Sequence, residues 1–208
     1  MQDSIEHRLG KNGEENVIKV AIFASGAGTN TKKIIHHFRE HAFIKISLVV
    51  CNKQGAGVIS IAQEADIPVL MIQKERFLAD GYLTELRAAE IDFLVLAGFL
   101  WKVPAVLTAA YPNRIVNLHP ALLPAYGGKG MYGANVHEAV INSGDSESGI
   151  TIHYVDEHYD NGDIIFQATC PVLPTDTPET LAAKIHALEY QHFPAVVAEA
   201  INAWKSLQ

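Results

Sequence analysis

The chain has 208 residues, of which 49% are hydrophobic, and a formal net charge of -7. A chain of this length can bury the core of one α/β domain. Its negative balance disfavours non-specific binding to nucleic acid or to an anionic membrane. Its longest apolar runs, such as residues 91–101, are much shorter than the roughly 20 residues that a membrane-spanning helix needs.

Residues 1–16 are polar and show neither helical nor strand periodicity. We therefore expect a disordered N-terminal arm at 1–16, followed by a single domain over 17–208. The arm has neither the apolar centre of a secretory signal nor the pattern of a transit peptide, which favours a cytoplasmic protein. Cys51 and Cys170 lie far apart without a paired spacing, which predicts reduced thiols.

Apolar runs alternate with helical patterns through the first half of the chain. Strands that alternate with helices at this spacing form a parallel, doubly wound sheet with right-handed crossovers. We therefore expect a Rossmann-like α/β fold that binds ligands at the carboxyl ends of its strands. The predicted strands are 17–24, 44–51, 69–72, 92–97 and 114–118, and the predicted helices follow residue 30 and span 57–65 and 77–89.

The last third of the chain has a different pattern. A helix is predicted over 133–142, and the alternating segments 150–156 and 164–172 predict a pair of antiparallel strands at the C-terminal side of the sheet. Thr177 and Pro178 suit the N-cap and first position of a long terminal helix that runs to Trp204. Pro194 should kink or split this helix.

The first candidate site is the glycine-rich loop 25–30, Ser-Gly-Ala-Gly-Thr-Asn, between the first strand and the first helix. Free N–H groups and the positive end of the helix dipole can bind a phosphate there. The loop lacks the third glycine of a dinucleotide fingerprint and the Lys-Ser/Thr of a P-loop. A tight turn capped by Thr29 explains the same residues, and the loop alone does not decide between the two interpretations.

The second candidate site is where the strand 114–118 runs into a segment rich in proline and glycine. The period of two puts Asn117 and His119 on the same side, roughly 6–7 Å apart along the backbone. An amide and an imidazole at this spacing can converge on one reacting carbonyl group. A hydrogen-bonded loop histidine beside a turn-forming asparagine is the alternative.

The third candidate site is the segment 153–163, which is dense in histidine and acidic residues. Alternation places Thr151 and His153 on the strand face opposite Ile150 and Ile152, and a loop follows over 156–162. The spacing matches no established set of metal ligands, so we expect no metal site. An aspartate from this loop could instead orient an imidazole and raise its pKa.

With these motifs, the chain resembles the phosphoribosylglycinamide formyltransferase family over about residues 17–201. The motifs that carry the resemblance are the 25–30 loop, Leu96-Ala-Gly-Phe-Leu100, Asn117-Leu-His-Pro120, Leu122-Leu-Pro124 and Asp160-Asn-Gly162. The resemblance implies formyl transfer from 10-formyltetrahydrofolate to the amine of phosphoribosylglycinamide in purine biosynthesis. It also implies small-molecule partners, no nucleic acid, no membrane, no metal, and a monomer or weak homodimer.

The resemblance implies roles for individual residues as well. Asn117 would hydrogen-bond the formyl oxygen, His119 would be a general acid or adjacent cation, and Asp160 would hold His119 and relay protons. The residues that would bind the ribose phosphate and the glycinamide are Gly28, Thr29, Asn30 and Glu189. The residues that would contact the folate are Lys74, Leu100, Trp101, Lys102, Val103, Asn117, Asp156, Glu157, His158, Tyr159 and Asp160.

The chain departs from the family pattern in three places. An arginine that many members place before the third helix has no unambiguous counterpart here, and Lys74 is the best match. Many members have a Met-Arg pair where this chain has Leu100-Trp101-Lys102, which leaves the contacts to the folate glutamate open. The segment 126–133 is longer and richer in glycine than is usual in the family.

Two other functional classes remain as alternatives. One is a related enzyme that hydrolyses the formyl folate or formylates tRNA, and the other is a non-enzymatic module that binds a phosphorylated ligand through residues 28–30. Either related enzyme would need a further domain, and the acidic balance also disfavours tRNA.

Overall fold

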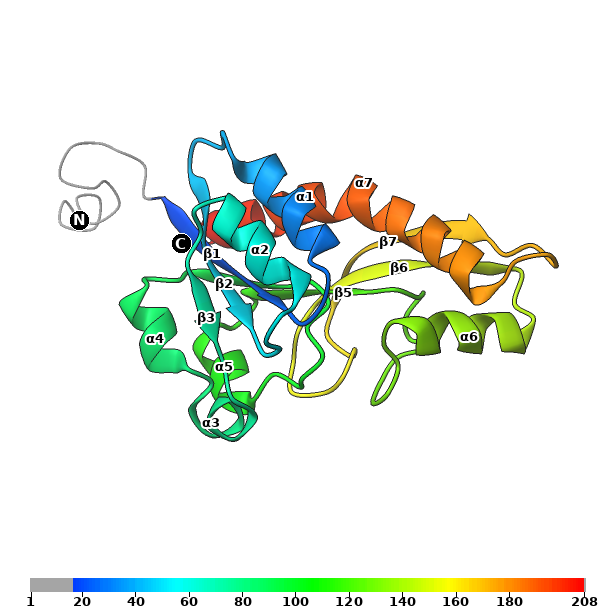
Figure 1. The fold of residues 1–208 in the computed structure, drawn as a ribbon, viewed down its shortest axis with the longest axis horizontal. Coiled ribbons are helices and arrows are strands. Elements are labelled where there is room, and N and C mark those ends of the chain that lie inside the picture. Colours follow the sequence, from blue (N-terminus) through cyan, green and yellow to red (C-terminus); the bar gives the residue numbers. More distant parts are fainter. Residues whose placement is uncertain (1–16, 208) are drawn as a thin grey trace.

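The computed structural model describes residues 17–207, so the predicted N-terminal arm lies outside the described residues. A seven-stranded sheet with helices on both faces forms the described part of the chain (Figure 1). The strands are β1 (Ile18–Ala24), β2 (Ile44–Cys51), β3 (Val69–Met71), β4 (Phe93–Leu96), β5 (Ile115–His119), β6 (Glu147–Tyr154) and β7 (Ile164–Pro171). The helices are α1 (Thr29–Phe38), α2 (Gly57–Glu64), α3 (Lys74–Asp80), α4 (Leu83–Ala88), α5 (Ala105–Ala110), α6 (Ala134–Ser143) and α7 (Pro178–Lys205).

The sheet has the order β3-β2-β1-β4-β5-β6-β7. Strands β1 to β5 pair in parallel, whereas β6 pairs antiparallel with both β5 and β7. This arrangement confirms the predicted Rossmann-like sheet with an antiparallel C-terminal pair. The winding direction reverses at β1, and ligands bind at such a position in doubly wound folds.

Alternation along β5 and β6 gives the two faces of the sheet different chemistry. Val116, Leu118, Ile150 and Ile152 belong to the apolar core on the face covered by α1 and α7. The intervening residues, Asn117, His119, Thr151 and His153, must therefore point to the other face. Ile115 belongs to the core on that second face, beside residues of α3, α4 and α5. On the second face, Asn117, His119, Thr151 and His153 therefore form a polar patch next to the apolar core.

Two predicted helices differ from the structure. The segment 77–89 forms two helices, α3 and α4, because Gly81 and Tyr82 both adopt the left-handed conformation, with φ of 63° and 55°. Tertiary contacts hold Tyr82 there: its N–H donates to Asp80 Oδ1 and its hydroxyl accepts from the backbone N–H of Gln73. Pro194 does not split the last helix, because α7 runs through it from Pro178 to Lys205; the alternative expectation, a kink, stays a prediction.

The N-termini of α7 and α1 are capped in different ways. At α7 the expected Thr177 cap and first-turn Pro178 are confirmed. At α1, in contrast, the N-cap is Gly28, without a side-chain cap, and Thr29 is the first helical residue. No helix between residues 17 and 207 is long and apolar enough to cross a membrane.

Candidate active site

Asn117, His119 and Asp160 meet on the polar patch of β5. Asp160 Oδ2 lies 3.7 Å from His119 Nδ1, and Asp160 Oδ1 lies 3.5 Å from Asn117 Nδ2. The loop between β6 and β7 carries Asp160 back over this face, where the backbone N–H of Gly128 donates to Asp160 Oδ2 at 2.9 Å. The fold therefore brings the three predicted catalytic residues together.

His153 of β6 is a fourth member of this cluster; it begins the third candidate segment, 153–163, but the sequence assigned it no role of its own. It pairs with Asn117 across the β5–β6 ladder. Its Nδ1 lies 2.8 Å from the Tyr154 carbonyl oxygen, so Nδ1 carries a proton, and in a neutral ring Nε2 accepts the 3.0 Å bond from Asn117 Nδ2. Burial lowers the pKa of His153, which favours this neutral ring. His153 thereby orients the Asn117 amide.

The contacts of His119 prepare it to exchange a proton with Asp160. His119 Nε2 lies 2.8 Å from the Tyr126 carbonyl oxygen and therefore donates to it. If the ring is neutral, the lone pair of Nδ1 points at the Asp160 carboxylate and the two repel each other. A proton held between Nδ1 and Asp160 removes this repulsion. Burial lowers the pKa of His119, and the charge of Asp160 and the Tyr126 carbonyl oppose this shift.

The segment after β5 is held in place by Thr151, which is fully buried on β6. The Thr151 hydroxyl donates to the Ala121 carbonyl oxygen at 2.7 Å and accepts from the backbone N–H of Leu123 at 2.9 Å. Gln167 Nε2 donates to the same hydroxyl and to the Leu123 carbonyl oxygen. This network fixes the chain immediately beyond His119.

The glycine-rich loop lies at the carboxyl end of β1, where the winding reverses. Leu100 N–H donates to Ser25 Oγ, and Val58 N–H donates to the Gly26 carbonyl oxygen, so the loop is tied to the segments that follow β4 and β2. Gly28 has a φ of +78°, and a Cβ there would lie 2.7 Å from Val58 Cα. Close packing therefore explains Gly28, whereas Gly26 has open space beside it.

Asn30 and Glu189, both predicted to contact the substrate, are in direct contact. Asn30 Nδ2 donates to Glu189 Oε2 at 2.8 Å, although 159 positions separate them in sequence. Glu189 is 6% exposed. Burial raises the pKa of its carboxyl group, opposed by the Asn30 hydrogen bond and the charge of His186. Only β4 separates β1 from β5, so the ends of these strands lie about 10 Å apart, a span that a small phosphorylated sugar can cover.

The predicted folate residues lie mostly on two segments, 97–104 after β4 and 155–163 after β6. Val103 is buried, whereas Leu100, Lys102, Glu157, His158 and Tyr159 are exposed. Lys102 Nζ lies 5.7 Å from the centre of the Tyr159 ring, which links the two segments. Asp156 is occupied within its own loop, accepting from His158 N–H and Asn161 Nδ2.

Trp101 and Lys74 occupy the remaining predicted folate positions. Trp101 is half-buried and packs against Phe77 and Phe99, which form an aromatic cluster with Phe23. Lys74 is exposed at the first position of α3. No polar contact joins Lys74 to another predicted folate residue among residues 17–207, so the structure does not bring it into this group.

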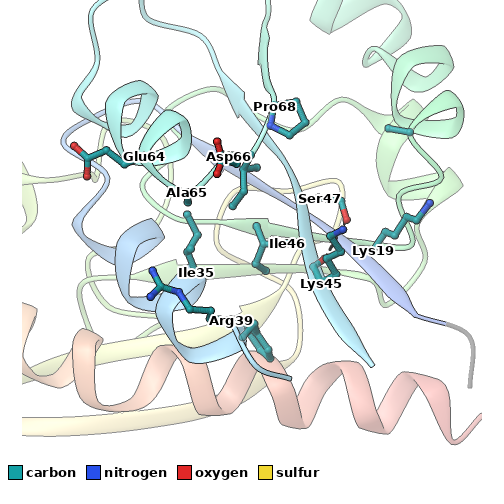
Figure 2. Close-up of a pocket in the computed structure, with 13 residues that line it drawn as sticks. Lys19, Ile35, Arg39, Lys45, Ile46, Ser47, Glu64, Ala65, Asp66 and Pro68 are labelled. Atoms are coloured by element: carbon teal, nitrogen blue, oxygen red, sulfur yellow. Dashed lines mark hydrogen bonds between the residues drawn. The ribbon is translucent and has the colours of Figure 1, made fainter. Parts of the chain in front are cut away.

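The described residues place no metal cluster at this site, and a cavity elsewhere in the fold is separate from it. Between residues 17 and 207 no three His, Cys, Asp or Glu side chains are grouped to hold a metal ion. A cavity of about 680 Å³ lies at the amino-terminal ends of β1 and β2, where Ile35, Ile46 and Asp66 line it (Figure 2). It contains none of the predicted site residues.

Comparisons with known proteins point to one family. Residues 18–197 match the model of the formyl transferase family. The chain is 33% identical over 190 residues to phosphoribosylglycinamide formyltransferase of Bacillus subtilis, covering 88% of this chain and 95% of that protein. It is 42% identical over 196 residues to the chloroplastic phosphoribosylglycinamide formyltransferase of Arabidopsis thaliana, covering 90% of this chain and 67% of the relative.

Other relatives are longer than the matched region. The chain spans 59% of the chloroplastic enzyme of Vigna unguiculata and 14% of the trifunctional purine biosynthetic protein adenosine-3 of Drosophila melanogaster. Among solved structures, phosphoribosylglycinamide formyltransferase from Bacillus halodurans superposes with a TM-score of 0.79 at 37% identity. That alignment covers 87% of this chain and 94% of the other.

Proposed function

Because this chain belongs to the formyl transferase family, we propose that it transfers the formyl group of 10-formyltetrahydrofolate to the amine of phosphoribosylglycinamide. The products are the formylated glycinamide and tetrahydrofolate, and the step belongs to purine biosynthesis. The observation that carries this proposal is the meeting of Asn117, His119 and Asp160 on the face of β5. The Asn30–Glu189 contact lies at the end of β1, which only β4 separates from β5.

The first turn of α1 suits the substrate phosphate. No side chain caps this helix, and its first turn contains no acidic residue. Its backbone N–H groups and dipole therefore remain available to an anion bound at Gly28, Thr29 and Asn30. Glu189 accepts a hydrogen bond from Asn30 and, in this function, a second one from the glycinamide amine. Asn30 keeps the carboxylate oriented toward that amine.

Asn117 and His119 stabilise the charge that develops during transfer. When the amine nitrogen attacks the formyl carbon, negative charge grows on the formyl oxygen. Preorganised donors at that position lower the barrier, typically by about 3 kcal/mol for one donor. Because His153 already orients the Asn117 amide, little reorganisation is needed when the reaction begins.

The proton balance assigns a role to the His119–Asp160 pair. The new C–N bond requires the amine to lose a proton, and cleavage of the bond between the formyl carbon and the folate N10 requires that nitrogen to gain one. His119 Nδ1 and Asp160 face one another at 3.7 Å, so the pair can accept the first proton and supply the second. No covalent intermediate with the enzyme is required.

The formyl donor lies between the segments 97–104 and 155–163 in this proposal. Buried Val103 and the neighbouring backbone groups suit the ring system, and the formyl group would then lie beside Asn117 and Asp160, which are in contact with one another. Leu100, Trp101, Lys102, Asp156, Glu157, His158 and Tyr159 would form the rest of the donor site, with Lys74 at a distance.

We further propose that residues 17–208 act as one formyltransferase domain in the cytoplasm, as a monomer or weak homodimer, without nucleic acid or membrane partners. The continuous sheet supports the single domain. The two free cysteines suit a reducing compartment. Sedimentation of the purified protein and microscopy of the tagged protein test the oligomeric state and the location.

The experiment that tests the reaction follows 10-formyltetrahydrofolate with and without phosphoribosylglycinamide and identifies the product by mass. We expect turnover only with the amine, giving the formylated glycinamide. Formate release without the amine would instead indicate a hydrolase. Binding of the phosphorylated amine without turnover would indicate a binding module.

A further inference from the structure

Three consecutive residues between β5 and α6 contact both members of the His119–Asp160 pair. The carbonyl oxygen of Tyr126 accepts from His119 Nε2 at 2.8 Å, and the N–H of Gly128 donates to Asp160 Oδ2 at 2.9 Å. Gly127 lies between them in sequence, and a Cβ there would be 3.4 Å from Asp160 Cβ. Because this tripeptide contacts both side chains, its position determines how His119 and Asp160 face each other.

The tripeptide, residues 126–128, has a conformation that its sequence does not favour. Tyr126 has a φ of 55°, in the left-handed region that bulky residues rarely adopt. The next two residues are glycines, which adopt many backbone conformations equally readily and have no side chains. The side chain of Tyr126 is therefore the only one with which the tripeptide can be held in place.

The Tyr126 side chain is anchored at the end of α6. Its hydroxyl donates to the Asp145 carboxylate and lies 2.6 Å from Ser143 Oγ. The hydrogen bond to Asp145 raises the pKa of Tyr126, so the hydroxyl keeps its proton at neutral pH. The ring packs against the apolar core on the face covered by α1 and α7, whereas Ser143 and Asp145 are exposed. Loss of the hydroxyl would therefore release the anchor and leave the core packing intact.

We propose that Tyr126 is a positioning residue of the reaction: its hydroxyl, held by Asp145, fixes the tripeptide that orients His119 and Asp160. The inference rests on the proposed function, in which protons move through this pair. The Tyr126 carbonyl keeps a proton on His119 Nε2 and so directs Nδ1 toward Asp160. The Gly128 N–H holds the carboxylate oxygen that faces Nδ1. A displacement of this tripeptide would move both groups out of the reactive geometry, which lowers the rate of the chemical step.

Tyr126→Phe removes the hydroxyl and keeps the ring. We expect kcat to fall about five- to tenfold, the usual effect of one hydrogen bond, because the pair is less well oriented. The KM of each substrate should stay close to its wild-type value. Steady-state kinetics with each substrate varied in turn measure these constants. Tyr132→Phe, at an exposed tyrosine of the same segment, is the matched control and should leave kcat unchanged.

The titration of His119 tests the positioning independently of catalysis. Burial lowers the pKa of His119, and the charge of Asp160 and the hydrogen bond to the Tyr126 carbonyl oppose this shift. A displaced tripeptide weakens both contacts, so the pKa of His119 should fall in Tyr126→Phe. His153, which also interacts with His119, is the same in the variant. NMR titration of the His119 ring, identified by the loss of its signal in His119→Ala, measures this pKa, and the acid limb of kcat/KM should move to lower pH with it.

Substitutions of Asp145 test the other end of the anchor. Asp145→Ala removes the acceptor and should lower both kcat and the pKa of His119, as Tyr126→Phe does. Asp145→Asn keeps an acceptor oxygen and should retain most of the wild-type kcat. Because Tyr126 and Asp145 act through one hydrogen bond, the double variant Tyr126→Phe/Asp145→Ala should be no slower than the slower single variant.

Three results would overturn the inference. One is a wild-type kcat and an unchanged pKa of His119 in Tyr126→Phe. Another is a fall in kcat that leaves the pKa of His119 unchanged, or that adds to the fall in Asp145→Ala, since either would indicate a structural effect. In both cases the proposed function stands, because the wild type still formylates the amine. The third is a wild-type protein that does not formylate the amine, which would overturn the proposed function and the inference with it.

Discussion

Asn30 Nδ2 donates a 2.8 Å hydrogen bond to Glu189 Oε2 and so connects the first turn of α1 to the middle of α7. Both side chains come from helices on the same face of the sheet, near the end of β1. The buried carboxyl group of Glu189 has a raised pKa, so this one hydrogen bond helps to keep it ionised for a substrate amine.

Glu189→Gln tests this role. The variant keeps the shape of the side chain but removes the charge, so we expect the KM of phosphoribosylglycinamide to rise by about tenfold or more, since a charged hydrogen bond is lost. The KM of the formyl donor should not change. Steady-state kinetics with each substrate varied in turn measure both values. Glu199→Gln, an exposed position on the same helix, is the control, and an unchanged amine KM in Glu189→Gln would remove Glu189 from the site.

His119→Ala should lower kcat by about 10²–10⁴-fold, the usual contribution of a general acid or base.

Asp160→Asn should shift the pH profile of the reaction. The charge of Asp160 opposes the lowering of the His119 pKa by burial, so its loss should lower that pKa further. The acid limb of kcat/KM, measured between pH 5 and 8, should then move to lower pH. An acid limb at the same pH would contradict the pairing.

Gly28→Ala and Gly26→Ala test whether close packing determines which glycine of the loop the fold requires. Gly28 has a positive φ and lies against Val58, so alanine there should lower the free energy of unfolding by more than about 1 kcal/mol. Gly26 has no neighbour within 4 Å of an added Cβ, and its variant should fold normally. Urea denaturation measures both. Equal losses of stability would show that packing against Val58 does not determine the requirement at residue 28.

Thr151→Val removes a buried hydroxyl while keeping the side-chain volume. The Leu123 N–H and the Gln167 amide would lose their acceptor, and we expect a loss of about 1–3 kcal/mol in unfolding free energy. Thr151→Ser retains the hydroxyl and should lose less. Chemical denaturation of both variants distinguishes the hydrogen bonds from the methyl group, and a serine variant as unstable as valine would contradict this account.

Acid should destabilise the protein partly through His137. Burial and the charge of His186 lower the pKa of His137 in the folded state, so below the ordinary histidine pKa of about 6.5 the unfolded chain binds more protons. Stability therefore falls as the pH falls through this range. His137→Leu should reduce the stability difference between pH 7 and pH 5, measured by urea denaturation. An unchanged difference in His137→Leu would contradict this account.

Much of the fold follows from local pattern. The apolar runs located the strands, because buried parallel strands are nearly continuous in hydrophobicity, and Thr177-Pro178 located the start of α7. The break at Gly81–Tyr82 was missed because Tyr82 is held by its hydrogen bond to Asp80 and by the one it accepts from Gln73, and such contacts leave no periodic signal. The helix α5 was also missed, because its six residues are too few to show a helical period.

The site was predictable to a similar extent. The period of two placed Asn117 and His119 on one face. It also placed His153 opposite Ile152, a signal that was available but not used. The neutral state of His153 and its bond to Asn117 depend on the β5–β6 register, which pairs residues 36 positions apart and cannot be read from either strand alone.

The aromatic cluster around Trp101 gives the protein an internal optical reporter. Of the two tryptophans, Trp101 packs on Phe77 and Phe99 beside the proposed donor site. Trp204 packs on Phe93 near the end of α7. In the proposed function, a donor that enters between the segments 97–104 and 155–163 would change the surroundings of the Trp101 indole and not those of Trp204. A change in the total tryptophan emission on addition of the donor can therefore be assigned to Trp101 in the unlabelled chain.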